Sequence, residues 1–320
     1  MSDIHSLDGD LFTVHDLLAW KPPPTRHIVW DGVLDAGHRL QIFGDEGSWK
    51  SMSAIHLAYS IANGTRWMGF HTSPATVLYI QGEMGRVSVR NRMEKYCNGT
   101  KNIYLAKPLA VPAEAERADK LAYPASVITQ VIQFIHLDEQ AGISSLRRKV
   151  DIIFSQFPAQ PLVVILDPLY KMFHHDLTVA KEVSYFCENM DLLLYDYNTY
   201  KNGVQRQLAL VFVHHSRKFS TDKDGNRISS GSEESFGAKQ LAWWSDTVLN
   251  TCLNGDDETK TTVDYIFTKH GRDSEGTLPK LITARWSKET LHPRILCRLM
   301  PSYPEDEIEA RGTGVYEGLE

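Results

Sequence analysis

The stretch Gly44-Asp45-Glu46-Gly47-Ser48-Trp49-Lys50-Ser51 decides the fold of this chain. It follows an apolar run at 40–43 and precedes a segment with a helical pattern at 52–62. Strand, glycine-containing loop, Lys-Ser and helix in this order predict a loop that binds the phosphates of a nucleotide. Trp49 departs from the usual G-x-x-x-x-G-K-[ST] pattern, because it stands where the second glycine belongs. Because of this departure, nucleotide binding has to be argued from the catalytic and metal-binding residues in the rest of the chain as well.

The composition is that of an ordinary globular protein. Its 320 residues are 42% hydrophobic and 23% charged, and 34 basic against 40 acidic residues give a net charge of −6. This balance argues against charge-driven binding of nucleic acid over the whole surface, although a local basic surface or an oligomer channel could still bind it. The sequence has no apolar run of about 18 residues, an acidic and polar beginning, and no C-x-x-C pair. We therefore expect a cytoplasmic protein with free thiols, no signal peptide and no membrane segment.

Apolar segments separated by helical ones predict an α/β fold. The segments at 162–166 and 208–213 are apolar at every position, which is typical of parallel strands that are covered on both faces. We expect a mostly parallel twisted sheet flanked by helices, with late antiparallel strands at one edge. The expected strands are 40–43, 75–81, 103–106, 162–166, 208–213, 247–253, 261–268 and 278–286. The expected helices are 12–20, 52–62, 86–96, 127–157 with a break near Gly142, and 179–200.

Two carboxylates follow strands of this sheet. Asp167 comes directly after the strand at 162–166, where such an acid can hold Mg²⁺ together with the hydroxyl of Ser51. An aspartate that only caps a turn would look the same. Glu83 follows the strand at 75–81, and because carboxyl ends of parallel strands face the ligand crevice, it could orient and deprotonate the attacking water. With Lys50 on the β- and γ-phosphates, these residues predict a site for ATP and Mg²⁺, although Glu83 could also be an ordinary surface glutamate.

Candidates for a γ-phosphate sensor and for a cation that stabilises the transition state lie further along the chain. His215, or its neighbour His214, ends the strand at 208–213 and could sense the γ-phosphate. Lys269 and Arg272 lie in an expected turn between two late strands, where a cation could reach into the site of a neighbouring subunit. Both could also be simple surface charges. Zinc binding by the histidine pairs is disfavoured, because no ligand spacing or cysteine partner supports it.

The order of these residues resembles that of RecA-type ATPases. Leu78-Tyr-Ile-Gln-Gly-Glu83 is similar to their strand with the catalytic glutamate, and Val211-Phe-Val-His-His-Ser-Arg-Lys218 is similar to their sensor strand. The segment at 230–249 resembles the one that follows in the plasmid and phage hexameric helicase group, which is the RepA type related to the DnaB helicase core. The chain has the motifs of that group in the same order: the phosphate loop, the glutamate, the aspartate, the strand that ends in histidine, and the Lys/Arg pair. The pair is spaced Lys-x-x-Arg here, where Lys-x-Arg is expected.

This resemblance implies a RecA-like core that works as a homo-oligomer, a hexameric ring or a filament, with ATP between subunits. Single-stranded DNA would pass over the loops at 171–177 and 217–234. In the second loop the contacts would be mainly to phosphates, since Phe219 is its one aromatic residue, and would come from Arg217, Lys218, Lys223 and Arg227. A loop without a role in DNA binding is the alternative. The chain would consist of an arm at 1–26, an ATPase domain at 27–300 and an acidic tail at 301–320, in a bacterial or phage-infected cell.

Three activities fit this pattern. The first is an ATP-driven motor on single-stranded DNA, a helicase-like translocase in replication or recombination, and a RecA-like recombination ATPase is kept open beside it. The second is a nucleotide-gated loader or assembly protein that hydrolyses ATP slowly, which Trp49 and the acidic net charge would suit. The third, a small-molecule kinase, is disfavoured because no basic lid segment is evident. In the motor, either Lys269 or Arg272 would act from the neighbouring subunit.

Overall fold

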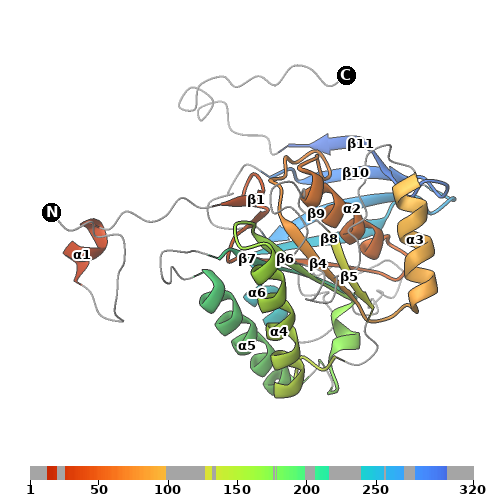
Figure 1. Ribbon diagram of the computed structural model, residues 1–320. Helices are drawn as coiled ribbons and strands as arrows, with labels where there is room; N and C mark the ends of the chain where they lie inside the picture. The colour runs from red at the N-terminus through yellow and green to blue at the C-terminus, as the bar shows by residue number, and fades with distance from the viewer. Residues whose placement is uncertain are drawn as a thin grey trace.

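A nine-stranded sheet forms the centre of the structure (Figure 1). The computed structural model describes residues 13–19, 26–98, 127–131, 135–175, 177, 179–198, 206–215, 239–255, 257–269 and 278–300. From one edge to the other, the strands are β11 (Pro293–Leu299), β10 (Leu281–Trp286), β9 (Thr262–Lys269), β8 (Thr247–Leu253), β3 (Arg39–Gly44), β7 (Leu208–His215), β6 (Leu162–Asp167), β4 (Thr76–Gln81) and β5 (Val127–Val131).

The sheet is parallel through most of its width and antiparallel at one edge. β8, β3, β7, β6, β4 and β5 pair in parallel, whereas β9, β10 and β11 pair with antiparallel neighbours. Every residue of β6 is buried, as is nearly every residue of β3 and β7, because both faces of the sheet are covered. The predicted fold class is confirmed, including the late antiparallel strands.

Two helical layers bury the two faces of the sheet. Side chains alternate along each strand, so Tyr79 of β4 faces one core and Leu78 of the same strand faces the other. The core that contains Tyr79 is covered by α2 (Lys50–Asn63) and α3 (Arg86–Asn98). The core that contains Leu78 is covered by α4 (Gln140–Gln156), α5 (Ala180–Asn198), α6 (Lys239–Trp244) and the short 3-10 helix η2 (Leu169–Met172).

The helix that the sequence predicts over 127–157 is wrong in its first part. Val127–Val131 forms the edge strand β5, which pairs in parallel with β4, and the helix begins only at Gln140. The break that the sequence predicts near Gly142 lies close to the start of the helix at Gln140, and Gly142 itself lies in the first turn of α4. A Cβ atom at Gly142 would overlap the main-chain carbonyl of His136, so the residue is a site of close approach. The strand expected at 103–106 lies outside the described residues.

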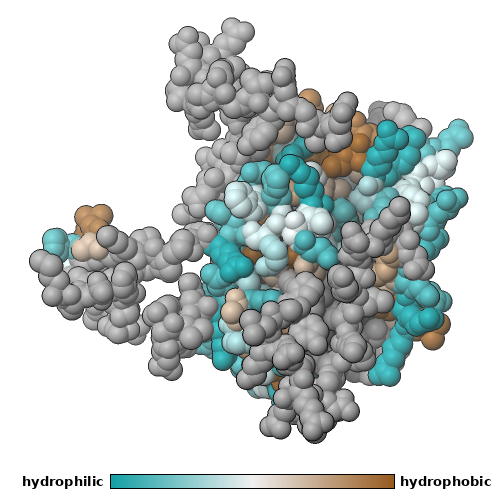
Figure 2. Space-filling view, turned by 45° about the horizontal axis from the view of Figure 1, so that its top comes forward, coloured by the Kyte–Doolittle hydropathy of each residue, from teal (hydrophilic) through white to brown (hydrophobic). Residues whose placement is uncertain are grey.

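Besides β5, three further strands and one surface feature were not expected. A small antiparallel sheet pairs β1 (His27–Val29) with β2 (Leu34–Asp35), and β11 extends the antiparallel edge of the main sheet. The expected helix of the arm is α1 (Val14–Ala19). Figure 2 shows apolar side chains near the top of the view, and the exposed apolar residues of the β11 edge are Ile295, Leu296, Leu299 and Met300. No helix in the described part of the chain combines the length and the apolar character needed to cross a bilayer.

Candidate active site

Four segments of the predicted site meet at one edge of the sheet. Gly44, where β3 ends and the phosphate loop starts, lies opposite His215 of β7. Asp167, at the end of β6, lies opposite Gln81 of β4, two residues before Glu83. These strands are parallel, so all four segments follow carboxyl ends. They share the edge at which open α/β sheets bind their ligands.

The phosphate loop is held from one side by β8. Gly44 has φ 155°, and a Cβ atom there would overlap the main-chain carbonyl and the side chain of Thr251. Only glycine fits this approach. The buried hydroxyl of Ser48 donates to the main-chain carbonyl of Asp45 at 2.8 Å and lies 2.8 Å from the Thr251 hydroxyl. The loop leads into a helix of 14 residues, and its main-chain N–H groups with that helix start favour an anion.

Trp49 takes the backbone conformation for which the usual pattern supplies glycine. Its φ of 60° and ψ of 21° lie in the left-handed region, immediately before α2 begins. The indole stacks on Trp286 of β10, with ring centres 5.4 Å apart and planes inclined by 14°. Its N–H donates to the main-chain carbonyl of Lys260 at 2.9 Å. The side chain therefore lies against the late antiparallel strands, and the left-handed conformation at position 49 is adopted without glycine.

Ser51 and Asp167 form the pair that could hold a magnesium ion. The Ser51 hydroxyl donates to Oδ1 of the buried Asp167 at 3.0 Å, and the Tyr79 hydroxyl donates to Oδ2. Burial raises the pKa of Asp167, and the hydrogen bonds from Tyr79 and Ser51 oppose that shift. Hydroxyl and carboxylate oxygens are the hard ligands that Mg²⁺ prefers, so these residues fit that ion.

Glu83 is exposed, but its main chain is fixed in place. Its N–H donates to the side-chain oxygen of the buried Gln81 at 2.8 Å, and the N–H of Gly82 donates to the main-chain carbonyl of Asp167 at 2.9 Å. The hydroxyl of Tyr170, in η2, donates to the Glu83 carboxylate at 3.3 Å. Burial, followed by the charge of Glu83, raises the pKa of Tyr170 to about 12, so this phenol stays a donor. Nothing in the sequence indicated Tyr170 as part of the site.

The two histidines at the end of β7 have different surroundings. The half-buried ring of His215 lies edge-on to Tyr170, with centres 5.1 Å apart and planes inclined by 63°. Burial, followed by the charge of Lys50, lowers the pKa of His215. His214 is fully buried, and burial lowers its pKa to about 3. Of the two, His215 is the one that the geometry places next to Tyr170 and hence to Glu83.

The match to a known family covers most of these segments. The family described as AAA domain matches residues 7–220, which include the phosphate loop, Glu83, Asp167 and His215. The chain belongs to the AAA domain family. This AAA protein is a P-loop ATPase.

Two solved structures are similar to the AAA protein at low sequence identity. The flagellar accessory protein FlaH from Methanocaldococcus jannaschii is 10% identical, with a TM-score of 0.43, over 82% of this chain and 90% of that one. A KaiC-like protein from Pyrococcus horikoshii is 12% identical, with a TM-score of 0.45, over 85% of this chain and 100% of that one. A search among curated proteins finds no match.

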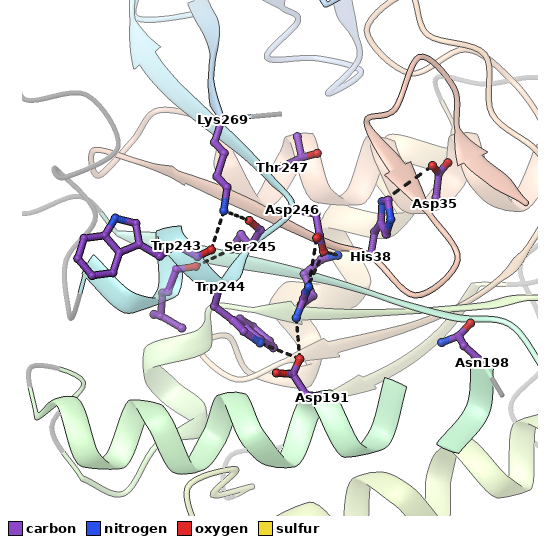
Figure 3. A network of polar contacts seen from close by, with 12 residues as sticks. Asp35, His38, Asp191, Asn198, Trp243, Trp244, Ser245, Asp246, Thr247 and Lys269 are labelled. Atoms are coloured by element: carbon purple, nitrogen blue, oxygen red, sulfur yellow. Dashed lines mark hydrogen bonds and ion pairs between the residues drawn. The ribbon is translucent and has the colours of Figure 1, made fainter. Parts of the chain in front are cut away.

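Lys269 of the AAA protein is engaged within its own chain (Figure 3). It ends β9, and its ammonium group donates to the main-chain carbonyls of Ala242 at 3.2 Å, Trp243 at 2.6 Å and Ser245. These carbonyls lie at the end of α6, so the lysine caps that helix. Burial lowers the pKa of Lys269, and the charge of Asp246 opposes that shift. In this conformation the three donors of the ammonium group serve α6.

An arginine fixes the same region to the central strand. Arg39, the first residue of β3, donates to both carboxylate oxygens of Asp246, at 2.8 and 3.1 Å, and to Asp191 of α5 at 2.6 Å. The two aspartates are labelled in Figure 3. Trp244 donates to the same Asp191 at 2.8 Å, and its ring lies 5.1 Å from the guanidinium carbon of Arg39. α6 is therefore anchored to β3 and α5 as well as capped by Lys269.

Arg272 lies outside the described residues of the AAA protein, but the strand that leads to it is described. β9 pairs antiparallel with β8, with Val263 opposite Leu253 and Lys269 opposite Val248. β8 is parallel to β3, so β9 starts near the edge that carries the phosphate loop and ends toward the opposite edge. The chain thus enters the segment 270–277 while running away from its own phosphate loop.

The predicted DNA loops are described only in part. Arg217, Lys218, Lys223 and Arg227 lie outside the described residues. In the first loop, Lys171 is exposed, and its ammonium nitrogen lies 5.1 Å from the ring centre of Tyr170. Asp138 accepts the main-chain N–H groups of His174 at 2.9 Å and His175 at 2.7 Å. This loop therefore begins at Tyr170, beside Glu83, and is tied to the segment that leads into α4.

The protonation of Lys50 is expected to make nucleotide binding by the AAA protein dependent on pH. Burial lowers the pKa of Lys50 to about 8, against the opposing charge of Asp45 and Asp167. Bound phosphates would raise this pKa again, so binding near pH 7 takes up almost no proton, whereas binding near pH 9 takes up about one proton per site. Calorimetry in buffers of different ionisation enthalpy measures this uptake. In a Lys50→Arg variant the uptake near pH 9 should vanish, since a guanidinium stays charged; equal uptake in both proteins would contradict the assignment to Lys50.

Proposed function

We propose that this chain is a magnesium-dependent ATP hydrolase that works as an oligomeric motor on single-stranded DNA. One observation carries the proposal. The register of the parallel strands brings the phosphate loop, Glu83, Asp167 and His215 to the same edge, whereas β9, the last described strand before Arg272 in the sequence, runs away from that edge. One subunit then supplies the phosphate loop, the two residues for Mg²⁺ and the catalytic carboxylate. A neighbouring subunit supplies the cation that stabilises the transition state.

The chemistry is in-line attack of water on the γ-phosphate. Glu83 orients the water and takes its proton, and the fixed main chain at 82–84 keeps the carboxylate at the end of β4. Lys50 compensates charge on the β- and γ-phosphates. Ser51 and Asp167 would hold Mg²⁺, which supplies further charge compensation when it is bound. His215 senses the γ-phosphate, and it lies beside Tyr170 at the start of the loop 171–177.

The site would be completed between subunits. Lys269 caps α6 in its own chain, so of the two cations Arg272 is the better candidate for the neighbour's site. A ring and a filament would both place Arg272 there, and they correspond to the helicase-like translocase and the RecA-like recombination ATPase. Electron microscopy of the protein with a non-hydrolysable ATP analogue distinguishes a closed ring from an open filament.

The proposal for single-stranded DNA rests on the two segments that follow β6 and β7. Both begin at the edge that carries the candidate site, since Tyr170 lies beside Glu83 and the chain leaves β7 at His215. Contacts to DNA phosphates by Lys171 and by the basic residues Arg217, Lys218, Lys223 and Arg227 could therefore act on the residues that meet the γ-phosphate.

Stimulation of ATP turnover tests the proposal. We expect single-stranded DNA to raise the rate of phosphate release by about tenfold or more, and the effect should weaken with salt because the contacts are to phosphates. Duplex DNA of the same length is the control for polyanion effects. Basal turnover that single-stranded DNA leaves unchanged would contradict the motor.

One contact favours a second candidate, a nucleotide-gated loader or assembly protein with slow hydrolysis. The hydroxyl of Tyr170 donates to the Glu83 carboxylate at 3.3 Å. This hydrogen bond engages the carboxylate that would otherwise activate the attacking water, so hydrolysis would be slow. In this candidate, Glu83→Gln would leave both turnover and DNA affinity unchanged. In the motor, the same substitution would abolish turnover and leave ATP binding intact.

A further inference from the structure

Trp49 is connected to the late strands by an aromatic and polar cluster, the Trp286 cluster, which consists of Trp49, Ser53, Tyr265 and Trp286. Trp286 is 1% exposed, and its indole N–H donates to the Tyr265 hydroxyl at 2.9 Å. That hydroxyl lies 2.8 Å from the hydroxyl of Ser53, which donates to the main-chain carbonyl of Trp49 at 2.9 Å. With the stack of Trp49 on Trp286, the contacts form a closed circuit through the loop, α2, β9 and β10.

The backbone at residue 49 needs such support. A left-handed conformation is readily adopted by glycine but is strongly disfavoured for a large side chain, by roughly 5- to 30-fold in an equilibrium constant. Trp49 nevertheless has φ 60°, directly between the phosphate loop and Lys50. The indole's stack and its hydrogen bond to Lys260 exist only when the side chain points to β10, so packing selects the backbone conformation.

We propose that Trp286 is a positioning residue for nucleotide binding, which holds Trp49 in the left-handed conformation and thereby keeps the phosphate loop and Lys50 in place. The proposal rests on the proposed binding of ATP by this loop and adds a residue of β10 to what determines it. Without the ring of Trp286, residue 49 adopts the left-handed conformation in a smaller fraction of molecules. The apparent affinity for nucleotide falls in proportion to the fraction of molecules that keep the left-handed conformation.

A pair of substitutions separates this role from general destabilisation. Trp286→Leu should weaken binding of Mg·ATP by roughly 5- to 30-fold, measured as a Kd by calorimetry. Trp49→Gly should bind within about twofold of the parent, because glycine adopts the conformation unaided. The double variant Trp49→Gly, Trp286→Leu should also bind within about twofold of the parent. Loss of packing alone would make the double variant worse than either single one.

The control is Trp243→Leu, which changes a tryptophan that is 71% exposed and lies outside the Trp286 cluster. Its ATP affinity should equal that of the parent, and thermal unfolding reports whether each variant is folded. If Trp286→Leu does not fold, Tyr265→Phe removes the hydroxyl between Ser53 and Trp286. Tyr265→Phe should weaken binding of Mg·ATP less than the loss expected for Trp286→Leu, and adding Trp49→Gly should again restore the affinity.

Two results would overturn the inference while leaving the proposed function standing. One is a folded Trp286→Leu, or in its place Tyr265→Phe, that binds Mg·ATP like the parent. The other is a double variant that carries Trp49→Gly and still binds Mg·ATP as weakly as the corresponding single variant, Trp286→Leu or Tyr265→Phe. A parent protein that binds no Mg·ATP would instead overturn the proposed function itself.

Discussion

Replacing Lys50 with alanine is expected to lower ATP turnover by a factor on the order of 10³ or more. The Lys50 ammonium group is buried at the start of α2 and lies next to the loop residues Asp45 and Ser48. It is the one cation that we place on the β- and γ-phosphates from within the subunit, and alanine cannot compensate the charge of the transition state. Single-turnover hydrolysis of labelled ATP measures the loss.

The matched control for Lys50→Ala is Lys95→Ala. Lys95 is an exposed lysine of α3, and its loss should leave turnover unchanged. Thermal unfolding should show that both variants are folded. A folded Lys50→Ala variant with more than about a tenth of the parent's turnover would mean that the loop does not act as a phosphate cradle.

Replacing Arg272 with alanine is expected to reduce turnover by a factor on the order of 10³, as for an arginine that acts from a neighbouring subunit. Affinity for Mg·ATP should change little, because the loop, Lys50 and the metal pair remain. Lys269→Ala is the comparison, since the loss of three hydrogen bonds to the end of α6 should lower the melting temperature more than the turnover. The opposite outcome would assign the cation to Lys269.

Mixed oligomers show whether Arg272 acts between subunits. A Lys50→Ala subunit still offers Arg272, and an Arg272→Ala subunit still offers an intact phosphate loop. Mixing the two inactive proteins should therefore restore part of the turnover, at interfaces where both intact halves meet. No recovery at any mixing ratio, in oligomers shown to exchange subunits, would place Arg272 in the site of its own chain.

The edge of the sheet that carries the candidate site could be predicted from the sequence. The segments at 162–166 and 208–213 are apolar at every position and end at Asp167 and His214-His215, and such strands are parallel and place their carboxyl ends together. Tyr170 and Thr251 could not be predicted in the same way. Their contacts to Glu83 and Gly44 depend on a short 3-10 helix and on the pairing of β8 with β3, and sequence order fixes neither of them.

The errors in secondary structure have local causes. Val127–Val131 contains four β-branched residues, which favour a strand, but its apolar residues also fit the helical period of the segment that follows. β11 begins with Pro293 and lies at the edge of the sheet, where proline is tolerated, and its sequence carried no clear strand signal. For Trp49, the sequence showed that a glycine was missing but not which distant residue compensates for it.

The stack of Trp49 on Trp286 also limits the order in which this sequence can change during evolution. While residue 49 is tryptophan, loss of the ring at 286 harms the phosphate loop, whereas the same loss is silent once residue 49 is glycine. The two positions are therefore epistatic, and the glycine has to arise first. Among related sequences, those with glycine at position 49 should be released from the need for an aromatic residue at 286, so the two positions should covary although almost the whole ATPase core separates them in the chain.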